Sequence, residues 1–90
     1  MEIEYDPNKN EKNIRERGLS FEEAEYFDFE TARFTVDTRK NYGETRIVAL
    51  GTLYERVHVL VFKKIEGGIR VISFRKANKR EINEYEIFRR

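Results

Sequence analysis

The sequence predicts an α+β fold with two N-terminal helices, an antiparallel β-meander of about four strands and a C-terminal helix. Three observations predict it. Helix-capping residues occur near both ends of the chain, the apolar period changes from helical to alternating near residue 33, and the connections between apolar runs are short. With 90 residues the chain has room for one domain, which we place at 1–90.

Polar and glycine residues predict the two N-terminal helices. Asp6 followed by Pro7 is typical of an N-cap and a first helical residue. Gly18 is typical of the residue that ends a helix. Ser20 and Glu23 have the spacing of a capping box, so a second short helix is expected to begin there.

Alternation of apolar and polar residues predicts the sheet. Residues 3–5 are expected to be extended, and a longer alternating region begins at Arg33. Gly67 and Gly68 supply the glycines that a hairpin turn requires. Gly51 lies inside an apolar run, where it indicates a bulge or a close approach by another backbone. The three longer predicted strands are 45–54, 57–63 and 69–75.

A final helix is predicted after the last strand. Asn78, with Glu81 three residues later, has the spacing of a capping box. Ile82, Tyr85 and Phe88 then recur at helical spacing and form an apolar stripe. The predicted order is strand, helix, helix, strands, helix, with the helices packed on one antiparallel sheet.

The charge is unevenly distributed along the chain. There are 18 Lys and Arg residues and 17 Asp and Glu residues, so the net charge is +1 at pH 7. Residues 1–30 hold ten acidic and four basic side chains, whereas residues 31–90 hold seven acidic and fourteen basic ones. Because a surface of one sign steers oppositely charged partners, the C-terminal two thirds is expected to face a polyanion.

Composition excludes several kinds of site. The chain has no cysteine, which excludes a disulfide framework and a thiolate metal site. The one histidine, His58, lies among apolar residues that favour a structural role over a metal site or a Ser-His-Asp triad. There is no glycine-rich phosphate loop, and no apolar run approaches the roughly 20 residues that span a bilayer. We therefore expect a cytoplasmic protein with no membrane segment and no cofactor.

Two stretches concentrate cationic residues. DTRKNYGETR at 37–46 lies between the alternating run that begins at Arg33 and the strand predicted at 45–54, and VISFRKANKREINEY at 71–85 joins the last strand to the final helix. If the meander brings them together, they form a cationic site that includes a carboxylate and a phenol. The side chains in question are Arg39, Lys40, Tyr42, Glu44 and Arg46 in the first stretch, and Arg75, Lys76, Lys79 and Arg80 in the second.

Such a site suits a phosphodiester. The guanidinium fork of arginine holds two phosphate oxygens, and positive charge stabilises the anion that develops during cleavage. RNA supplies its own nucleophile, the ribose 2′-OH, so in principle no metal is required. Solvated charge is the simpler interpretation of either stretch alone. By strict alternation, Arg75 is expected to share a face with Val71 and Ser73, opposite Ile72 and Phe74.

Four segments carry a family resemblance. They are YDPNKNEKN at 5–13, GLSFEEA at 18–24, DTRKNYGETRIVALG at 37–51 and VISFRKANKREINEY at 71–85. In this order they resemble the BrnT family of ribonuclease toxins from type II toxin–antitoxin systems, and they cover nearly the whole chain. The resemblance implies a RelE-like fold of helices, an antiparallel sheet and a further helix.

The resemblance also implies an activity and partners. It implies metal-independent RNA cleavage that arrests translation, and an antitoxin partner, BrnA, with a ribbon-helix-helix DNA-binding part. Together such a pair binds its own promoter DNA. By position, Glu44, Arg46 and Arg75 match the family's GE-x-R and S-x-R-x-A elements, while Glu81 and Tyr85 match its E…Y tail.

These matches give each candidate residue an expected role. Arg75 and Arg46 are expected to stabilise phosphate charge, and Glu44 or Lys40 to move a proton or to orient a group that does so. The catalytic candidates are thus Arg75, Arg46, Glu44 and Lys40. The residues expected to bind RNA are Arg39, Tyr42, Lys76, Lys79, Arg80 and Tyr85.

Two positions of this chain depart from the family pattern. Where the family usually has Lys-His-Gly, this chain has Glu16-Arg17-Gly18, so either another group takes over any proton transfer by that histidine or the activity is reduced. Tyr5 replaces a frequent tryptophan, which is a change of packing.

Two alternative functions are open. They are a non-catalytic module that acts as antitoxin partner and co-repressor, and a metal nuclease built on paired carboxylates.

Overall fold

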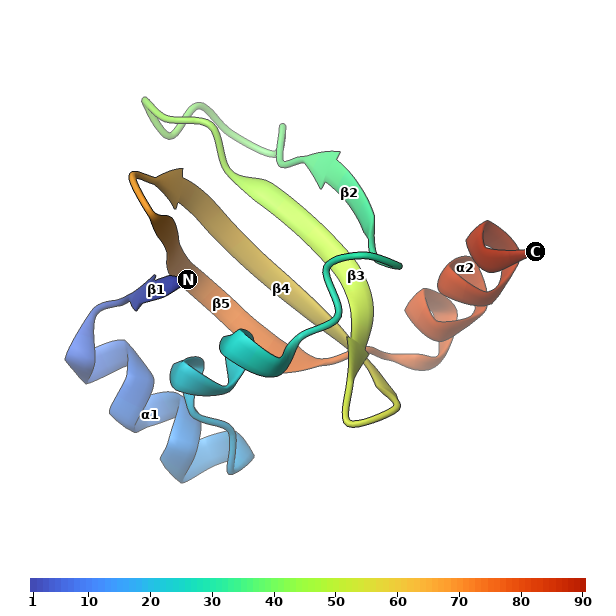
Figure 1. The fold of residues 1–90 in the computed structure, drawn as a ribbon, viewed down its shortest axis with the longest axis horizontal. Coiled ribbons are helices and arrows are strands. Elements are labelled where there is room, and N and C mark those ends of the chain that lie inside the picture. Colours follow the sequence, from blue (N-terminus) through green and yellow to red (C-terminus); the bar gives the residue numbers. More distant parts are fainter.

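The computed structural model describes residues 1–90 as a five-stranded sheet with two α-helices and one 3₁₀-helix (Figure 1). This is the predicted α+β class. None of the helices combines the length and apolar character that crossing a membrane requires. In chain order the elements are β1 (Glu2–Glu4), α1 (Pro7–Arg17), η1 (Phe21–Tyr26), β2 (Arg33–Val36), β3 (Ile47–Leu53), β4 (Arg56–Ile65), β5 (Gly68–Lys76) and α2 (Lys79–Arg89).

The sheet is mixed, with strand order β1-β5-β4-β3-β2. β2 to β5 form the predicted antiparallel meander, and β1 adds a fifth strand parallel to β5. The meander has the expected four strands, and β1 brings the whole sheet to five. The extended segment expected at residues 3–5 is present one residue earlier, as Glu2–Glu4, and three of its residues pair with β5.

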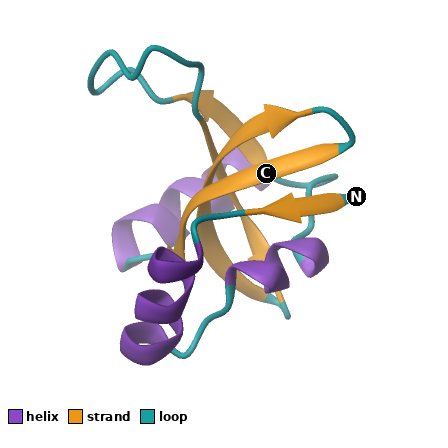
Figure 2. Ribbon diagram, turned by 90° about the vertical axis from the view of Figure 1, so that its left-hand side faces the viewer, coloured by secondary structure: helices purple, strands orange, loops and turns teal.

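The two sides of the sheet carry separate cores. The larger core lies under η1 and includes the fully buried side chains of Leu53, Leu60 and Phe74. The smaller core lies on the opposite face, where Tyr85 of α2 packs with Val59. Figures 1 and 2 both show the long loop between β2 and β3 projecting beyond the sheet. This is the loop in which the sequence places the first cationic stretch.

The predicted helix caps are confirmed. Asp6 accepts a hydrogen bond from the N–H of Asn8, and capping boxes form at Ser20 with Glu23 and at residues 78 and 81. The second helix, however, is a 3₁₀-helix of six residues. Tight i→i+3 turns are typical of such short helical segments.

A β-bulge in β5 changes which residues share a face. Strict alternation predicted Val71 on the face of Arg75 and Ile72 on the opposite face, and both predictions are wrong. The pairing of β4 with β5 shifts after Val61, which adds one residue to β5. Val71 consequently joins Phe74 in the larger core, while Ile72 packs against the smaller core.

Two glycines are required by close contacts. A Cβ on Gly51 would lie 2.7 Å from Phe27 Cζ and 2.9 Å from Ala32 Cβ, so the segment after η1 packs directly on β3. The prediction of a close approach is confirmed, although side chains make the nearest contacts. A Cβ on Gly68 would collide with the backbone of Glu2, which allows β1 to pair with β5.

Candidate functional site

A groove of about 370 Å³ on the α2 side of the sheet brings the two predicted cationic stretches together. Arg39 and Arg46 reach it from the loop between β2 and β3, and Arg75 reaches it from the end of β5. Its floor contains apolar side chains of the central strands, including Val59 and Val61. The expected convergence of the two stretches is therefore present.

Arg75 is held in place by a carboxylate of α2. Its Nη1 and Nη2 donate to Oε1 and Oε2 of Glu81 at 2.8 and 2.9 Å. Glu81 also accepts the N–H of Asn78 at 2.8 Å as part of the helix cap. The hydrogen bonds from Arg75 are the main reason that the pKa of Glu81 falls to about 2. The cap residue thus has a second function that its spacing did not indicate, which is to orient Arg75.

Arg46 is fixed between a ring and a carboxylate. Its Cζ lies 3.9 Å from the ring centroid of Tyr42, and its Nε donates to Glu44 at 3.2 Å. The hydrogen bond from Arg46 lowers the pKa of Glu44, and Lys63 Nζ lies 3.5 Å from the same carboxylate. Glu44 lines a neighbouring hollow with Lys63 and does not line the groove.

Asp37 anchors the cationic loop. Its buried carboxylate accepts from Nε and Nη2 of Arg39 at 2.9 and 2.8 Å and from the hydroxyl of Tyr42 at 3.2 Å. These bonds, above all those from Arg39, hold the pKa of Asp37 well below its usual range. The N–H of Asp37 donates to the carbonyl of Arg46 at 2.8 Å. Sequence reasoning missed this role, although an aspartate at the start of a polar loop is a known turn signal.

Three other predicted residues are exposed and loosely held. Lys40 forms no ion pair, and its Nζ lies 5.3 Å from the ring centroid of Tyr42. Lys79 and Arg80 lie in the first turn of α2, where Arg80 has one distant partner, Glu84, at 3.9 Å. None of the three lines the groove.

Tyr85 has a different environment from the other predicted RNA-binding residues. Only 8% of it is exposed, and it packs in the smaller core. Its hydroxyl donates to the carbonyl or the hydroxyl of Thr31, each 3.4 Å away. This arrangement fastens α2 to the sheet and keeps the ring away from solvent.

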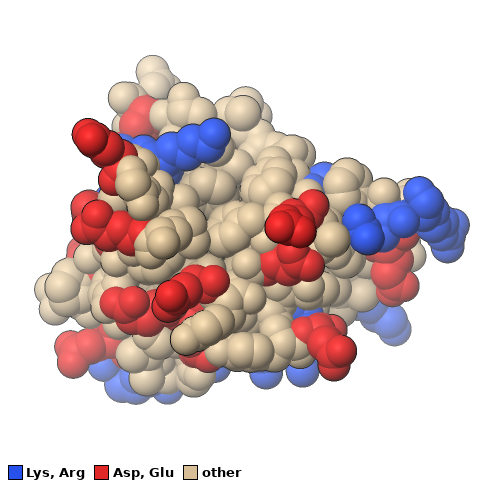
Figure 3. All heavy atoms as spheres, in the orientation of Figure 1, with Lys and Arg blue, Asp and Glu red and all other residues tan.

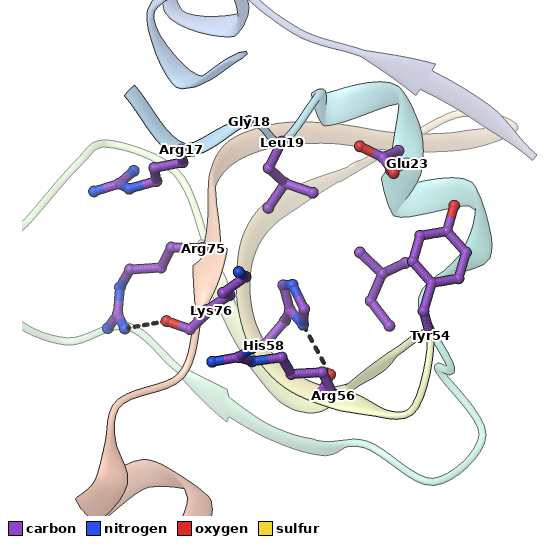
Figure 4. Close-up of a pocket in the computed structure, with 10 residues that line it drawn as sticks. Arg17, Gly18, Leu19, Glu23, Tyr54, Arg56, His58, Arg75 and Lys76 are labelled. Atoms are coloured by element: carbon purple, nitrogen blue, oxygen red, sulfur yellow. Dashed lines mark hydrogen bonds between the residues drawn. The ribbon is translucent and has the colours of Figure 1, made fainter. Parts of the chain in front are cut away.

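A second cationic region is a pocket of about 590 Å³ at the end of the sheet (Figure 4). The C-terminal end of α1, the turn between β3 and β4 and the end of β5 meet there. Of its four cations, only Arg75 and Lys76 were predicted from the sequence as site residues. The cationic lining residues are Arg17, Arg56, Arg75 and Lys76.

Asn13 holds one side of this pocket together. Its buried Nδ2 donates to the carbonyls of Leu19 and Phe74, both at 2.9 Å. Its Oδ1 accepts from Nη1 of Arg17 at 2.8 Å. Every polar atom of this amide side chain is therefore engaged, and α1 is tied to β5 immediately before Arg75.

His58 forms part of the pocket wall and is also packed in the sheet. It is 4% exposed, and its ring centroid lies 5.6 Å from that of Phe74. Its Nδ1 lies 2.8 Å from the carbonyl of Arg56, and because a carbonyl only accepts, Nδ1 carries the proton. Burial lowers the pKa of the imidazole, so it is neutral at pH 7. No cluster of three or more His, Asp and Glu side chains is placed to hold a metal ion.

One face of the molecule is rich in acidic side chains. Figure 3 shows Asp and Glu side chains spread over much of the face viewed, with most Lys and Arg side chains toward its edges. A polyanion is expected to avoid such a face. The groove and the pocket are the two concave regions in which arginines gather.

Comparison with known families identifies the family of this chain. The family described as ribonuclease toxin, BrnT, of type II toxin-antitoxin system matches residues 5–81. No curated protein matches the chain. The matched range extends from Tyr5 to the first turn of α2 and contains both cationic regions, so the resemblance noted in four segments is confirmed. The chain belongs to the BrnT family of ribonuclease toxins of type II toxin–antitoxin systems.

Proposed function

We propose that this protein is a metal-independent RNA endonuclease that arrests translation in the cytoplasm and is neutralised by a BrnA-like antitoxin. Membership of the family supports ribonuclease activity and an antitoxin partner. The assignment of this activity to individual residues rests on one observation: Arg46 and Arg75 converge on the same groove. Each guanidinium is already oriented by a carboxylate before RNA binds.

In the proposed reaction a phosphodiester lies in the groove between these two arginines. The ribose 2′-oxygen attacks phosphorus, the bond to the 5′-oxygen breaks, and the products end in a 2′,3′-cyclic phosphate and a 5′-hydroxyl. Arg46 and Arg75 donate hydrogen bonds to the non-bridging oxygens, where negative charge increases in the transition state. Because both side chains are held in place, little reorganisation is needed as that charge develops.

The remaining candidates have supporting roles. Lys40 does not line the groove, but it is an exposed, unpaired cation of the same loop, and we assign to it the proton that the departing 5′-oxygen takes up once RNA is bound. The proton of the 2′-OH passes to water. Glu44 is a positioning residue, because it is engaged by Arg46 and lies outside the groove. The flanking RNA backbone contacts the exposed cations at the edges of the site, which are Arg39, Lys76, Lys79 and Arg80.

Cleavage of RNA in excess EDTA tests this function. We expect the purified wild type to produce fragments with 2′,3′-cyclic phosphate ends, and Arg46→Ala to cleave about 10²–10³ times more slowly. Arg15→Ala is the matched control, because this exposed arginine of α1 lines neither cationic region and forms no ion pair. If Arg46→Ala cleaves as fast as the control, the groove is not the active site.

A non-catalytic role as antitoxin partner and co-repressor is the second candidate. One observation favours it: each arginine of the groove is paired with a carboxylate, which reduces the net charge available for catalysis. Binding of RNA, or of promoter DNA together with the antitoxin, without any cleavage supports this function. Cleavage that EDTA abolishes supports a metal nuclease instead.

A further inference from the structure

The pocket at the end of the sheet holds positive charges that no carboxylate neutralises. Arg17, Arg56 and Lys76 line it without forming an ion pair, and among its cations only Arg75 has one. Glu23 is the one carboxylate in the lining. Uncompensated charge around a concave surface concentrates its field there, so the pocket attracts an anion.

The frame of this pocket is fixed before any ligand arrives. Asn13 ties Arg17 to the carbonyl of Phe74, next to the end of β5. Lys76 of β5 lies opposite His58 of β4 in the sheet, and the carbonyl of Arg56 accepts a hydrogen bond from Nδ1 of His58. A preformed site loses little conformational freedom when it binds.

Two exposed tyrosines lie side by side at the end of the pocket where Glu23 is. Tyr54 is 65% exposed and Tyr26 is 62% exposed, with their ring centroids 6.2 Å apart and their planes 31° from parallel. Figure 4 places Tyr54 at one end of the pocket and Arg17 at the other. Aromatic side chains beside cations are the usual means by which proteins bind single-stranded nucleic acids, because bases stack on the rings.

The turn that presents Tyr54 is unfavourable for this residue. Tyr54 and Glu55 join β3 to β4 with φ values of 50° and 66°. A two-residue turn with both φ values positive favours Asn-Gly, and a bulky side chain is rarely found there. A tyrosine retained at the cost of local strain suggests a role other than stability.

We propose that this pocket binds one nucleotide of a single-stranded RNA, with Arg17, Arg56 and Lys76 on the phosphate and Tyr54 stacked on the base. Arg75 lines both the pocket and the groove, so a strand held in the pocket continues past Arg75 toward Arg46. The inference rests on the proposed ribonuclease function and adds to it a binding site beside the cleaved bond.

Binding of a short 2′-O-methyl RNA tests the phosphate contacts, because this RNA lacks the nucleophile and stays intact. We expect Arg17→Ala with Arg56→Ala to weaken Kd by at least about tenfold in fluorescence anisotropy. The matched control is Arg15→Ala with Lys64→Ala, which removes two exposed, unpaired cations outside the pocket and is expected to change Kd by less than about threefold.

A change in the turn tests the stacking contact without the risk of unfolding. Tyr54→Asn with Glu55→Gly creates the residue pair that this turn favours, so the melting temperature is expected to rise. Loss of the ring is nevertheless expected to weaken Kd for the same RNA by about tenfold. Weaker binding by a more stable protein cannot be attributed to damage to the fold.

His58 provides an independent signal for a ligand in the pocket. It is the only histidine, so the NMR titration of its imidazole needs no further assignment. Its charged neighbours are Arg56, Lys76 and Glu23. A bound phosphate adds negative charge nearby, so we expect the pKa of His58 to rise when the 2′-O-methyl RNA is present. An unchanged titration at saturating RNA contradicts the assignment.

The outcomes separate the inference from the proposed function. If the wild type cleaves RNA and the pocket variants bind it as tightly as the wild type, the pocket assignment alone is wrong. If those variants bind RNA normally but lose an antitoxin, the pocket is a protein interface and the assignment is again wrong. If the wild type neither binds nor cleaves RNA, the proposed function fails as well.

Discussion

The groove and the pocket differ in what holds their cations. In the groove, Arg39, Arg46 and Arg75 each form an ion pair, with Asp37, Glu44 and Glu81 respectively. In the pocket, a neutral amide holds Arg17, and two further cations have no charged partner. The groove therefore has oriented but largely balanced charge, whereas the pocket has an excess of positive charge.

This difference indicates that the two regions have different functions, although both contain several arginines. An arginine paired with a carboxylate is fixed in direction, which suits contact with a transition state. An unpaired cation attracts a phosphate more strongly at a distance, which suits binding of the substrate. We therefore assign the chemistry to the groove and much of the RNA affinity to the pocket, with Arg75 shared between them.

The largest expected effect is that of Arg75→Ala, because this residue belongs to both regions. We expect cleavage to fall by about 10³ or more, because a contact to the transition state and a contact to the bound strand are both lost, and growth arrest on expression to be lost. Arg75→Lys is expected to restore only part of the activity, since an ammonium cannot make the paired contact of the fork. Cleavage assays beside thermal unfolding measure this. Full activity of Arg75→Ala would contradict the claim that Arg75 acts in both the groove and the pocket.

The salt dependence of RNA binding distinguishes the unpaired cations of the pocket from the paired arginines of the groove. For single-stranded nucleic acid each phosphate contact contributes about 0.7 to the slope of log K against log salt. Replacing Arg17, Arg56 and Lys76 by alanine is expected to reduce that slope by about 0.7, because all three contact the same phosphate. Arg39→Ala is expected to reduce it by less than about 0.7, because Asp37 already balances this arginine. Equal reductions of the slope by the two variants would mean that the ion pair of Arg39 with Asp37 has no effect on RNA binding.

Low pH is expected to weaken the ion pairs that hold the groove more than the contacts that hold the pocket. The pKa of Glu81 is about 2 in the folded chain against an ordinary value of 4.5, so the unfolded state binds more protons between these pH values. The stability from this carboxylate is complete above pH 4.5 and is lost as the pH falls toward 2.

Comparison of the wild type with Glu81→Gln isolates this contribution, because other carboxylates titrate in both proteins. We expect the wild type to be more stable near neutral pH by about 1–3 kcal/mol, a modest amount because Arg75 is partly in solvent. The difference is expected to shrink in acid. Urea unfolding at several pH values measures it, and a difference that is independent of pH contradicts the ion-pair explanation.

The parts of the fold that local interactions determine could be predicted from the sequence. The caps at Asp6, Ser20 and Asn78 depend on residues no more than three positions away, and all three are confirmed. The antiparallel meander follows from alternation and short turns. The approach of the loop at 37–46 to Arg75 could be expected as well, because it follows from the same meander.

What the sequence could not predict depends on distant contacts. The bulge at Ile72 changes the faces of β5 through its pairing with β4. The pocket unites Arg17, Arg56 and Lys76 from three separate elements, with no shared motif to connect them. The pairing of Glu81 with Arg75 was likewise hidden, because the helix cap already explained the position of Glu81.

The division between binding and chemistry is tested most directly by measuring Kd and the cleavage rate at saturating protein for two variants. For Arg46→Ala, we expect the saturated cleavage rate to fall by about 10²–10³ while Kd for 2′-O-methyl RNA changes by less than about threefold. For Arg17→Ala with Arg56→Ala, we expect Kd to weaken more than the saturated rate falls. If Arg46→Ala weakens binding as much as it slows cleavage, or if the pocket variant loses rate without losing affinity, the division is contradicted.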